Sequence, residues 1–425
     1  MAELNLAEWE TADPATHPVL SDRSLTTIQQ RTAAERWRFA MRIEETRSGL
    51  RIRAKQHVGV VQLGDLRICI RPKLPVATLW PLLAYGLGLD AVPERPPVDF
   101  AWTGDMPELL AAMLLAEAQG LQRGGLAHGY TPQEEWLETP RGRIDMGVLA
   151  RSLPLSRAAL PCAHHVFSSD ILCNQVVAAG LRLALKWVAS PQLRSALHAA
   201  ASHWQLHCKP VTLSPSVLAA ADRGRSRLLQ RYTPAHTLVR ALVERSGPAD
   251  DLGSGSERLP GALWNMAALF ERAVARYLSE HLPPPWVVDT QHRLRRLYTV
   301  TKGKHAHNAS VPRPDLVVRS GSRPAAVLDT KYRDLSTTSL PPSMLYQMSV
   351  YSLAFGGDRP IPAVVLYAVP SGARDDVRIN LHVEHGLDRT ILLRAVPLDD
   401  LVASLGTGEE PEEALRWLHG PSEAA

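Results

Sequence analysis

The chain has 425 residues, which predicts two or three domains at roughly 150 residues per domain. Hydrophobic residues make up 45% and charged residues 21%, which is typical of globular proteins and excludes disorder, collagen or coiled coil as a description of the whole chain. Lys and Arg total 47 and Asp and Glu 43, for a net charge of +4. That charge is compatible with a nucleic-acid partner only if the basic residues are clustered.

The sequence predicts a cytoplasmic protein. None of its 4 cysteines forms a C-x-x-C pair, and so few in a chain of this length do not make a disulfide scaffold. The N-terminus carries three glutamates within its first ten residues and no apolar segment, so it is not a secretory signal. The longest apolar stretch, Leu79–Leu89, is about half as long as a membrane-spanning helix requires.

The N-terminal third predicts a short helical region followed by strands. The first forty residues have an amphipathic helical pattern that ends near Arg38. Apolar residues then alternate with polar ones in several short runs, and Gly64-Asp65 is typical of a turn. The expected result is a meander or small barrel of three or four strands, with runs at 39–43, 50–54, 58–63 and 66–70.

Helical patterns dominate the middle of the chain. Helices are expected at about 77–90 and 105–119, then a glycine-rich loop at 120–129, and 170–245 is expected to be almost wholly helical. Residues 246–260 are rich in Gly, Ser and Pro and predict a linker. We therefore expect an α+β multidomain protein with three parts: a β-rich N-terminal domain (1–130), a mainly helical middle region (131–255) and a C-terminal α/β domain (256–425).

Two segments of the C-terminal domain predict strands that carry charged side chains. Val311–Val318 contains Asp315, and Ala325–Tyr332 contains Asp329 and Lys331. Residues two apart on a strand share a face, so Asp329 and Lys331 point the same way. If the two strands are neighbours, Asp315 reaches the same face. Two carboxylates that close together favour a bound cation, usually Mg²⁺, and a nearby lysine suits phosphodiester hydrolysis.

Two predicted helices add further candidates. In the helix expected at 261–282, Glu271 lies on the apolar side, where a carboxylate is costly without a metal or cation partner. In the helix expected at 343–355, Gln347 and Tyr351 are four residues apart and project from one face. A helix-surface ion pair for Glu271 and plain helix packing for the other two remained open as alternatives.

The order of these elements resembles a known nuclease pattern. P-D…D-x-K is the signature of the PD-(D/E)xK superfamily, and an upstream helical Glu with a downstream Q-x-x-x-Y resembles its RecB-like branch. The segments "RPDLVV", "VLDTKYR" and "YQMSVYSLAF" resemble McrC, the nuclease subunit of McrBC-type modification-dependent restriction systems. In the N-terminal half "GVVQLGDLRICIRPKLP", "TPRGRID" and "SSDILCNQVVAAGLRLAL" resemble McrC segments in the expected order.

The resemblance implies a fold and an activity for the C-terminal part. Residues 256–425 would form a restriction-endonuclease-like domain that cleaves DNA with Mg²⁺, for which Mn²⁺ can substitute. Asp315 and Asp329 match the metal ligands, with Glu271 as a supporting acid, and Lys331 matches the catalytic lysine. The substrate-binding residues would be Gln347, Tyr351, Arg313 and Arg333.

The resemblance also implies partners. McrC-like proteins dock through their β-rich N-terminal part on a hexameric AAA+ GTPase of the McrB type, stimulate its GTP hydrolysis, and cut methylated double-stranded foreign DNA only together with it. The chain has no G-x-x-x-x-G-K-[ST] motif, so we expect it to bind no nucleotide itself. Residues 293–333 hold ten basic residues against two acids, a local net charge of +8 that suits a phosphate backbone.

The sequence is also compatible with other functions. The chain could be a catalytically silent assembly subunit of an AAA+ motor, or a RecB-like repair nuclease that requires a free DNA end. A zinc site was a further alternative, with the candidate ligands Cys162, His164, His165, Cys173, His203 and His207. Arg141 and Arg143 were considered as phosphate contacts, and Arg71 and Lys73 as contacts to the motor or to DNA.

Overall fold

The computed structural model describes residues 2–89, 106–151, 159–223, 227–245, 261–290, 313–336, 340–356, 359–372, 375–382, 387–405 and 411–418. The chain forms two compact units, each built from several separate stretches. The first comprises Met1–Leu4, Gly59–Cys69 and Pro93–Leu263, and the second comprises Asn5–Val58, Ile70–Val92 and Trp264–Ala425. Among the described residues, no helix is both long and apolar enough to cross a membrane. The fold is a mixed α/β architecture with several sheets, as expected.

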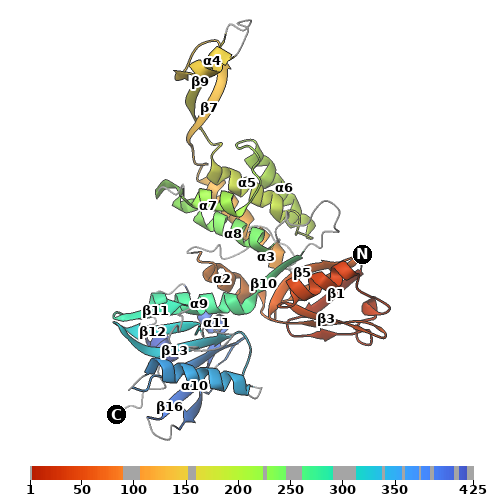
Figure 1. Cartoon of the computed structure of the whole chain (residues 1–425), viewed down its shortest axis with the longest axis vertical. Helices are drawn as coiled ribbons and strands as arrows, with labels where there is room; N and C mark the ends of the chain where they lie inside the picture. The colour runs from red at the N-terminus through yellow and green to blue at the C-terminus, as the bar shows by residue number, and fades with distance from the viewer. Residues whose placement is uncertain are drawn as a thin grey trace, which may run out of the picture. The chain divides into compact units, whose positions relative to one another are not determined.

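The predicted helical region forms a bundle in the first unit (Figure 1). Its helices are α3 (Met106–Arg123), α5 (Leu172–Ala184), α6 (Pro191–Gln205), α7 (Pro215–Arg223) and α8 (Thr233–Arg245), with the 3₁₀ turn η3 (Arg227–Tyr232) before α8. Helix α5 buries Val176, Val177 and Leu181 at helical spacing, which confirms the periodicity seen in the sequence.

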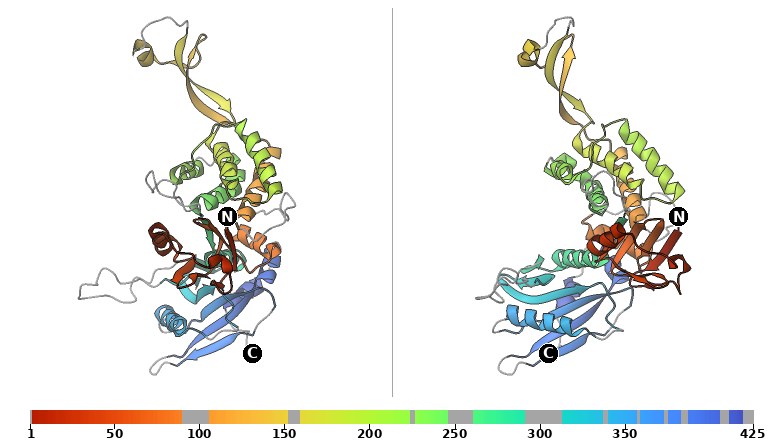
Figure 2. Two further views of the ribbon diagram at one scale, coloured as in Figure 1. Left: turned by 90° about the vertical axis from the view of Figure 1, so that its right-hand side faces the viewer. Right: turned by 45° about the vertical axis from the view of Figure 1, so that its right-hand side comes forward.

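Three strands that the sequence pattern did not reveal project from this bundle (Figures 1 and 2). β7 (Gly129–Leu137) and β9 (Leu160–Ser168) pair antiparallel, and the short β8 (Arg143–Ile144) joins β9, followed by α4 (Met146–Arg151). Most of β7 is exposed on both faces, so it lacks the alternation of buried and exposed residues by which strands are recognised.

A buried asparagine anchors the base of this hairpin. The Nδ2 group of Asn174 on α5 donates hydrogen bonds to the carbonyl oxygens of Ala127 (2.9 Å) and Ser169 (2.7 Å). Its Oδ1 accepts one from the Tyr232 hydroxyl (2.6 Å). Ala127 precedes β7 and Ser169 follows β9, so one side chain holds both ends of the hairpin.

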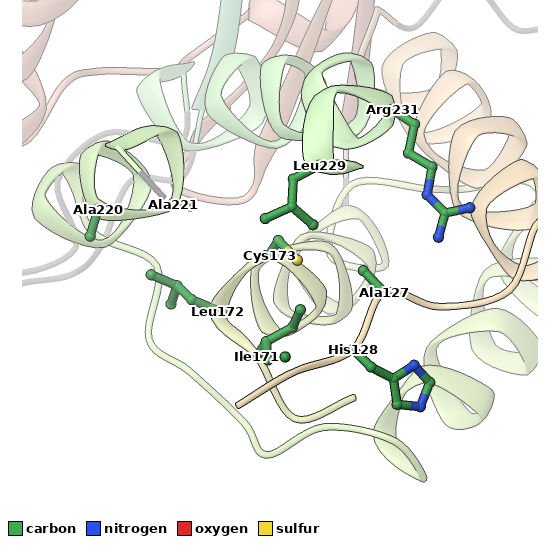
Figure 3. A pocket seen from close by; sticks show the side chains of 10 residues that line it. Ala127, His128, Ile171, Leu172, Cys173, Ala220, Ala221, Leu229 and Arg231 are labelled. Carbon is green, nitrogen blue, oxygen red and sulfur yellow. The ribbon is translucent and has the colours of Figure 1, made fainter. Parts of the chain in front are cut away.

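A pocket opens beside the hairpin base (Figure 3). Its walls are mainly apolar, and Arg231 on its rim donates from Nη1 to the carbonyl oxygen of Gly124 (2.9 Å). None of the residues predicted for the nuclease site lines it.

The four N-terminal strands form where the sequence predicts them, but the expected single meander or barrel is wrong, because β4 and β5 lie in different sheets. β3 (Met41–Thr46), β4 (Gly49–Ala54), β5 (His57–Leu63) and β6 (Leu66–Arg71) follow one another, and Gly64 takes the positive φ of 62° that its turn requires. They contribute to two sheets, with strand orders β1-β6-β5-β10 and β2-β4-β3, completed by β1 (Ala2–Ala7), β2 (Thr11–Ala12) and β10 (Gly261–Asn265).

The helix predicted over the first forty residues is wrong for most of its length. Leu4 and Leu6 are buried at 2% exposure while their neighbours Glu3 and Asn5 are not, so this segment has the two-residue period of a strand. Helical backbone is confined to the 3₁₀ turn η1 (Pro18–Leu20), α1 (Thr27–Thr32) and the π-helical turn η2 (Ala33–Trp37).

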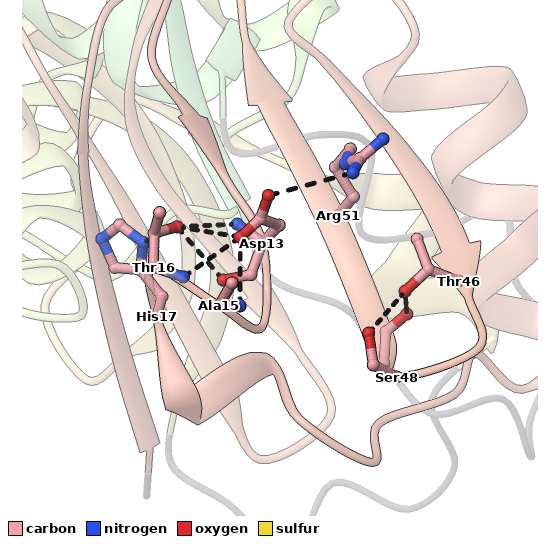
Figure 4. Close-up of polar contacts among 8 residues, drawn as sticks. Asp13, Ala15, Thr16, His17, Thr46, Ser48 and Arg51 are labelled. Atoms are coloured by element: carbon pink, nitrogen blue, oxygen red, sulfur yellow. Dashed lines mark hydrogen bonds and ion pairs between the residues drawn. The ribbon is translucent and has the colours of Figure 1, made fainter.

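An aspartate orders the turn between β2 and η1 (Figure 4). The Oδ1 atom of Asp13 accepts hydrogen bonds from the backbone amides of Ala15 and Thr16, both at 3.1 Å. Its Oδ2 lies 3.9 Å from the Arg51 guanidinium on β4. These backbone bonds hold the pKa of the Asp13 carboxyl below its usual value.

The second unit contains a six-stranded mixed sheet with the order β11-β12-β13-β14-β16-β15. β13 pairs parallel with β14 and β14 parallel with β16, and the other pairs are antiparallel. The strands are β11 (Trp286–Thr290), β12 (Leu316–Ser320), β13 (Arg323–Lys331), β14 (Ala363–Val369), β15 (Val377–Leu381) and β16 (Arg389–Pro397).

Helices cover both faces of this sheet (Figures 1 and 2). On one face α10 (Pro342–Gly356) packs Met344, Met348 and Tyr351 against a core that includes Val327 and Val365. On the other, α9 (Met266–His281) brings Phe270 to 6.3 Å, between ring centroids, from Tyr332. The unit also contains α2 (Val76–Gly86), α11 (Leu398–Ser404) and α12 (Pro411–Leu418).

Several predicted boundaries shift. The helix expected from residue 261 begins at Met266, because Gly261–Asn265 form β10 and Asn265 caps the helix by accepting from the Ala268 amide (3.2 Å). The strand expected at 311–318 begins at Leu316. The glycine-rich loop begins later, since α3 continues to Arg123. The predicted linker at 246–260 lies outside the described residues.

Close packing of α5 on α8 leads to a stability prediction. A Cβ atom on Gly180 would lie 2.2 Å from Cγ2 of Val239, whereas one on Gly120 of α3 would meet nothing within 4 Å. Both changes to alanine gain the same helix propensity, so their difference isolates the overpacking cost. We expect G180A to be less stable than G120A by about 1–3 kcal/mol in urea unfolding. Equal midpoints would show that the interface between α5 and α8 can open at no cost.

Candidate active site

The candidate site is built on β13. Asp329 and Lys331 lie on this strand on the same side as Val327, on the face covered by α10. The Asp329 side chain is 3% exposed and that of Lys331 36%. The Lys331 ammonium forms an ion pair with Oδ2 of Asp329. The Lys331 ammonium is therefore paired with the buried Asp329 carboxylate and is also partly accessible to solvent.

Asp315 lies at the start of the neighbouring strand. β12 and β13 pair with Leu316 opposite Leu328, so continuing the register by one residue sets Asp315 opposite Asp329. The Oδ2 atom of Asp315 accepts hydrogen bonds from the Thr330 amide (2.8 Å) and the Thr330 hydroxyl (3.0 Å). The strand geometry thus brings together the two carboxylates and the lysine that the sequence motif predicted.

Among the described residues, Lys331 only partly balances the charges of this cluster. Burial raises the pKa of the Asp329 carboxyl from 3.8 to about 6, although the Lys331 ammonium lowers it, and the Asp315 carboxylate raises it again. Oδ2 of Asp329 is buried and receives no hydrogen bond from an amide or hydroxyl of the described residues. One lysine beside two close carboxylates leaves a negative excess that a cation would neutralise.

Gln347 and Tyr351 on α10 lie near this cluster. Nε2 of Gln347 donates to the Tyr351 hydroxyl (3.1 Å). Tyr351 is buried and Gln347 exposed, so the pair runs from the core toward the solvent. Burial raises the pKa of the Tyr351 hydroxyl, and the negative charges of Asp329 and Asp315 add to that effect. The helix thus presents both predicted substrate-side residues to the cluster.

Glu271 does not complete a three-ligand site. Its side chain on α9 is half-buried, and it has interactions of its own. Within the described ranges, no three His, Cys, Asp or Glu side chains are placed to hold a metal ion together. Asp315 and Asp329 lie close together among the described residues, and the third ligand expected from the sequence does not join them there.

The same finding counts against the zinc alternative for the part of the chain that the structure describes. Cys162 and Cys173 are buried free thiols. His164 lies 3.3 Å from a carboxylate oxygen of Glu135, and the rings of His203 and His207 lie 5.0 Å apart.

The basic segment is only partly described. Arg313 and Arg333 flank the two site strands and are exposed, so both can reach a phosphate backbone. Arg319 instead donates to Asp289 on β11 (2.5 Å). Half of the ten basic residues lie outside the described residues: Arg293, Arg295, Arg296, Lys302 and Lys304.

The donor set fits Mg²⁺. This cation prefers oxygen ligands, keeps several of its waters and commonly takes one or two protein carboxylates. Asp329 supplies a buried carboxylate, and the Asp315 carboxylate is fixed by two hydrogen bonds. Asp315 and Asp329 are the residues that would hold the ion.

Comparison with known proteins assigns the chain to a family. Residues 52–367 match the model of the McrBC 5-methylcytosine restriction system component family. The chain belongs to this family. The matched segment contains Asp315, Asp329 and Lys331, and the family membership confirms the resemblance drawn from the motifs. No curated protein sequence matches the McrBC-family chain.

Solved structures support its fold. One similar chain comes from the refined half-complex of a tetradecameric assembly of Thermococcus gammatolerans McrB AAA+ hexamers with bound McrC, with 18% identity and a TM-score of 0.61, covering 96% of this chain and 100% of that one. A second comes from the cryo-EM structure of the Thermococcus gammatolerans McrBC complex, with 16% identity and a TM-score of 0.46, covering 65% and 87%. At this identity the first match shows that the McrBC-family chain shares the fold.

One contact of the site escaped the sequence analysis. Thr330, between Asp329 and Lys331, donates two hydrogen bonds to Asp315, which the spacing of the motif does not predict. Only the strand register could have revealed this contact, because it depends on which residue lies opposite the end of β12.

The raised pKa of Asp329 predicts a pH-dependent stability. The folded state takes up the proton more tightly than the unfolded state, so the stabilisation is full below about pH 4 and is lost as pH rises to about 6. In EDTA, the stability of wild type relative to D329N should fall by about 3 kcal/mol across this window. Urea unfolding of both proteins between pH 4 and 7 measures the difference. Parallel curves would mean that Asp329 has an ordinary pKa.

Proposed function

We propose that this chain is the McrC-type nuclease subunit of a modification-dependent restriction system. In this proposal it docks on an AAA+ GTPase of the McrB type, stimulates GTP hydrolysis and cleaves methylated foreign DNA in the cytoplasm. The observation that carries the proposal is the convergence of Asp315, Asp329 and Lys331 at the adjoining ends of β12 and β13, in a chain of the McrBC family.

The proposed nuclease domain is the predicted segment 256–425. A mixed sheet with α9 and α10 on opposite faces, and with the D-x-K residues on a central strand, supports a restriction-endonuclease-like PD-(D/E)xK domain. We assign partner docking to the β-rich segment 1–130, and 131–255 remains the proposed middle region.

The two carboxylates would bind Mg²⁺, with Mn²⁺ as a substitute. Such an ion polarises the phosphate and lowers the pKa of an attacking water. Asp329 would be ionised above its pKa of about 6 and so be ready to bind the cation at neutral pH. Glu271 is the supporting acid of the proposed site, although it forms no three-residue cluster with the other two carboxylates among the described residues.

Lys331 would act on the substrate phosphate. In the metal-free chain its ammonium is paired with Asp329, and its partial exposure leaves it access to solvent. When Asp315 and Asp329 hold a cation, the Lys331 ammonium would be available to stabilise negative charge on the phosphate. Gln347 and Tyr351 would orient the DNA strand, and Arg313 and Arg333 would bind its backbone.

The partner is inferred from the family and the similar structures. The Thermococcus gammatolerans structure with the higher TM-score contains McrB AAA+ hexamers with bound McrC. The present sequence lacks a G-x-x-x-x-G-K-[ST] motif, so we assign GTP hydrolysis to the partner. The chain would then supply the cleavage site and the GTPase would supply the motor.

Cleavage by the assembled complex tests this function. Wild type, D315A, D329A and K331A, each copurified with its motor from the native host, would be given methylated or unmethylated plasmid with Mg²⁺, with and without GTP. We expect cutting by wild type that requires GTP and methylation. A charge that acts on the transition state is worth about 10²–10³-fold, so each variant should fall by at least that factor. D334N, in the turn after β13, is the control and should cut normally.

Other outcomes would point to other functions. Full phage defence by a D329A strain, with the motor's GTPase still stimulated, would favour a catalytically silent assembly subunit. Cutting that needs ATP and a free DNA end would favour a repair nuclease. Unchanged metal binding by both D315A and D329A would refute the proposed metal site.

Arg313 and Arg333 allow a separate test of DNA binding. If each neutralises one phosphate of a duplex, replacing either by glutamine should reduce the slope of log K against log salt by about 0.9. Fluorescence anisotropy with a labelled duplex in Ca²⁺, over a range of salt concentrations, measures the slope. R53Q on β4 serves as a control, and a slope equal to that of wild type would remove the tested arginine from the DNA-binding surface.

A further inference from the structure

Thr330 lies between Asp329 and Lys331 on β13, but it faces the opposite side of the sheet. It is 7% exposed, which is unusual for a hydroxyl-bearing residue at the end of a strand. A buried hydroxyl and a buried amide both need hydrogen-bond partners. The identity of these partners shows whether Thr330 serves only for packing or has a further role.

Both groups of Thr330 bond to the same atom. The pairing of β12 with β13 begins at Leu316 opposite Leu328, and the Thr330 amide donates to the Asp315 side chain instead of to a strand carbonyl. The hydroxyl donates to the same Oδ2 atom at 3.0 Å. Two donors that converge on one carboxylate oxygen fix the rotation of the carboxylate plane.

The two carboxylate oxygens of Asp315 therefore differ in their hydrogen bonding. Oδ2 receives both hydrogen bonds from Thr330, and Oδ1 receives neither. Asp315 is half-buried and lies at a strand end, where its side chain would otherwise sample several rotamers. Freezing it in one rotamer in advance removes an entropy cost from any later binding step.

We propose that Thr330 is a positioning residue that holds the Asp315 carboxylate in its metal-binding orientation. The proposal rests on the nuclease function proposed above. It deepens that function by assigning a role to Thr330, the middle residue of the D-T-K motif. Thr330 does not itself touch the metal or the substrate. It acts through Asp315. A valine at this position has the same shape as threonine but cannot donate the hydroxyl hydrogen bond to the Asp315 carboxylate.

The role is tested by metal binding, without cleavage. Mn²⁺ affinity of the full-length, metal-free chain is measured by electron paramagnetic resonance for wild type, T330V, T330S and D329N. Losing an outer contact to a metal ligand typically costs 10–100-fold in affinity, and we expect that loss for T330V. T330S keeps the hydroxyl and should bind within about threefold of wild type. T390V, on β16 of the same sheet, should bind as wild type does.

A cleavage assay with the motor adds a second readout. T330V should need a Mg²⁺ concentration raised by the same 10–100-fold for half-maximal rate, and saturating Mg²⁺ should restore most of kcat. A residue that only stabilises the sheet would lower the melting temperature without moving the Mg²⁺ requirement. Melting in EDTA is therefore measured for each variant. If T330V does not fold, the comparison of T330A with T330S provides the same contrast.

The two proposals fail in different ways. If D329N binds Mn²⁺ as tightly as wild type, the proposed metal site itself is wrong. If D329N loses Mn²⁺ but T330V binds it as wild type does, the metal site stands and the role of Thr330 is refuted. Equal weakening of T330V and T330S would also refute it, because the hydroxyl would then not be the important group.

Discussion

The rest of the site depends on one constraint: two carboxylates are brought together in a mostly buried setting, and in the described part of the chain Lys331 is the cation paired with them. Burial raises the free energy of the ionised Asp329, Asp315 adds repulsion, and Lys331 offsets only part of both effects. A fold that keeps such an arrangement bears a cost in stability. The cost is explicable if a divalent cation and a phosphate complete the charge balance during function.

The sheet supplies the rigidity that this arrangement needs. β13 has partners on both sides, antiparallel β12 and parallel β14, and helices pack on both of its faces. Val327 on the same face as Asp329 belongs to the core formed with α10, so the strand cannot rotate without disrupting that core. The positions of the charged groups are therefore set by packing, and the hydrogen bonds of Thr330 orient the Asp315 carboxylate.

The sequence was most informative where periodicity and chemistry agreed. The strand expected around Asp329 and the helix expected around Gln347 and Tyr351 both form, and the motif order led to the family that residues 52–367 confirm. It failed at the N-terminus, where two buried leucines at alternate positions were taken for part of a helix. It also failed at β7, whose exposed faces carry no periodic signal. The hydrogen bonds of Thr330 to Asp315 depend on how two strands pair, and local sequence patterns do not reveal that pairing.

The central place of β13 also determines how the site behaves in time. Amides of a strand flanked on both sides exchange with solvent mainly when the whole sheet opens, whereas edge strands such as β11 and β15 open in smaller fluctuations. We therefore expect the amides of Asp329 and Lys331 to exchange more slowly than those of β11 and β15. If the proposed cleavage function is right, local unfolding would not switch such a site off. Its control would then come from whatever admits the metal and the DNA.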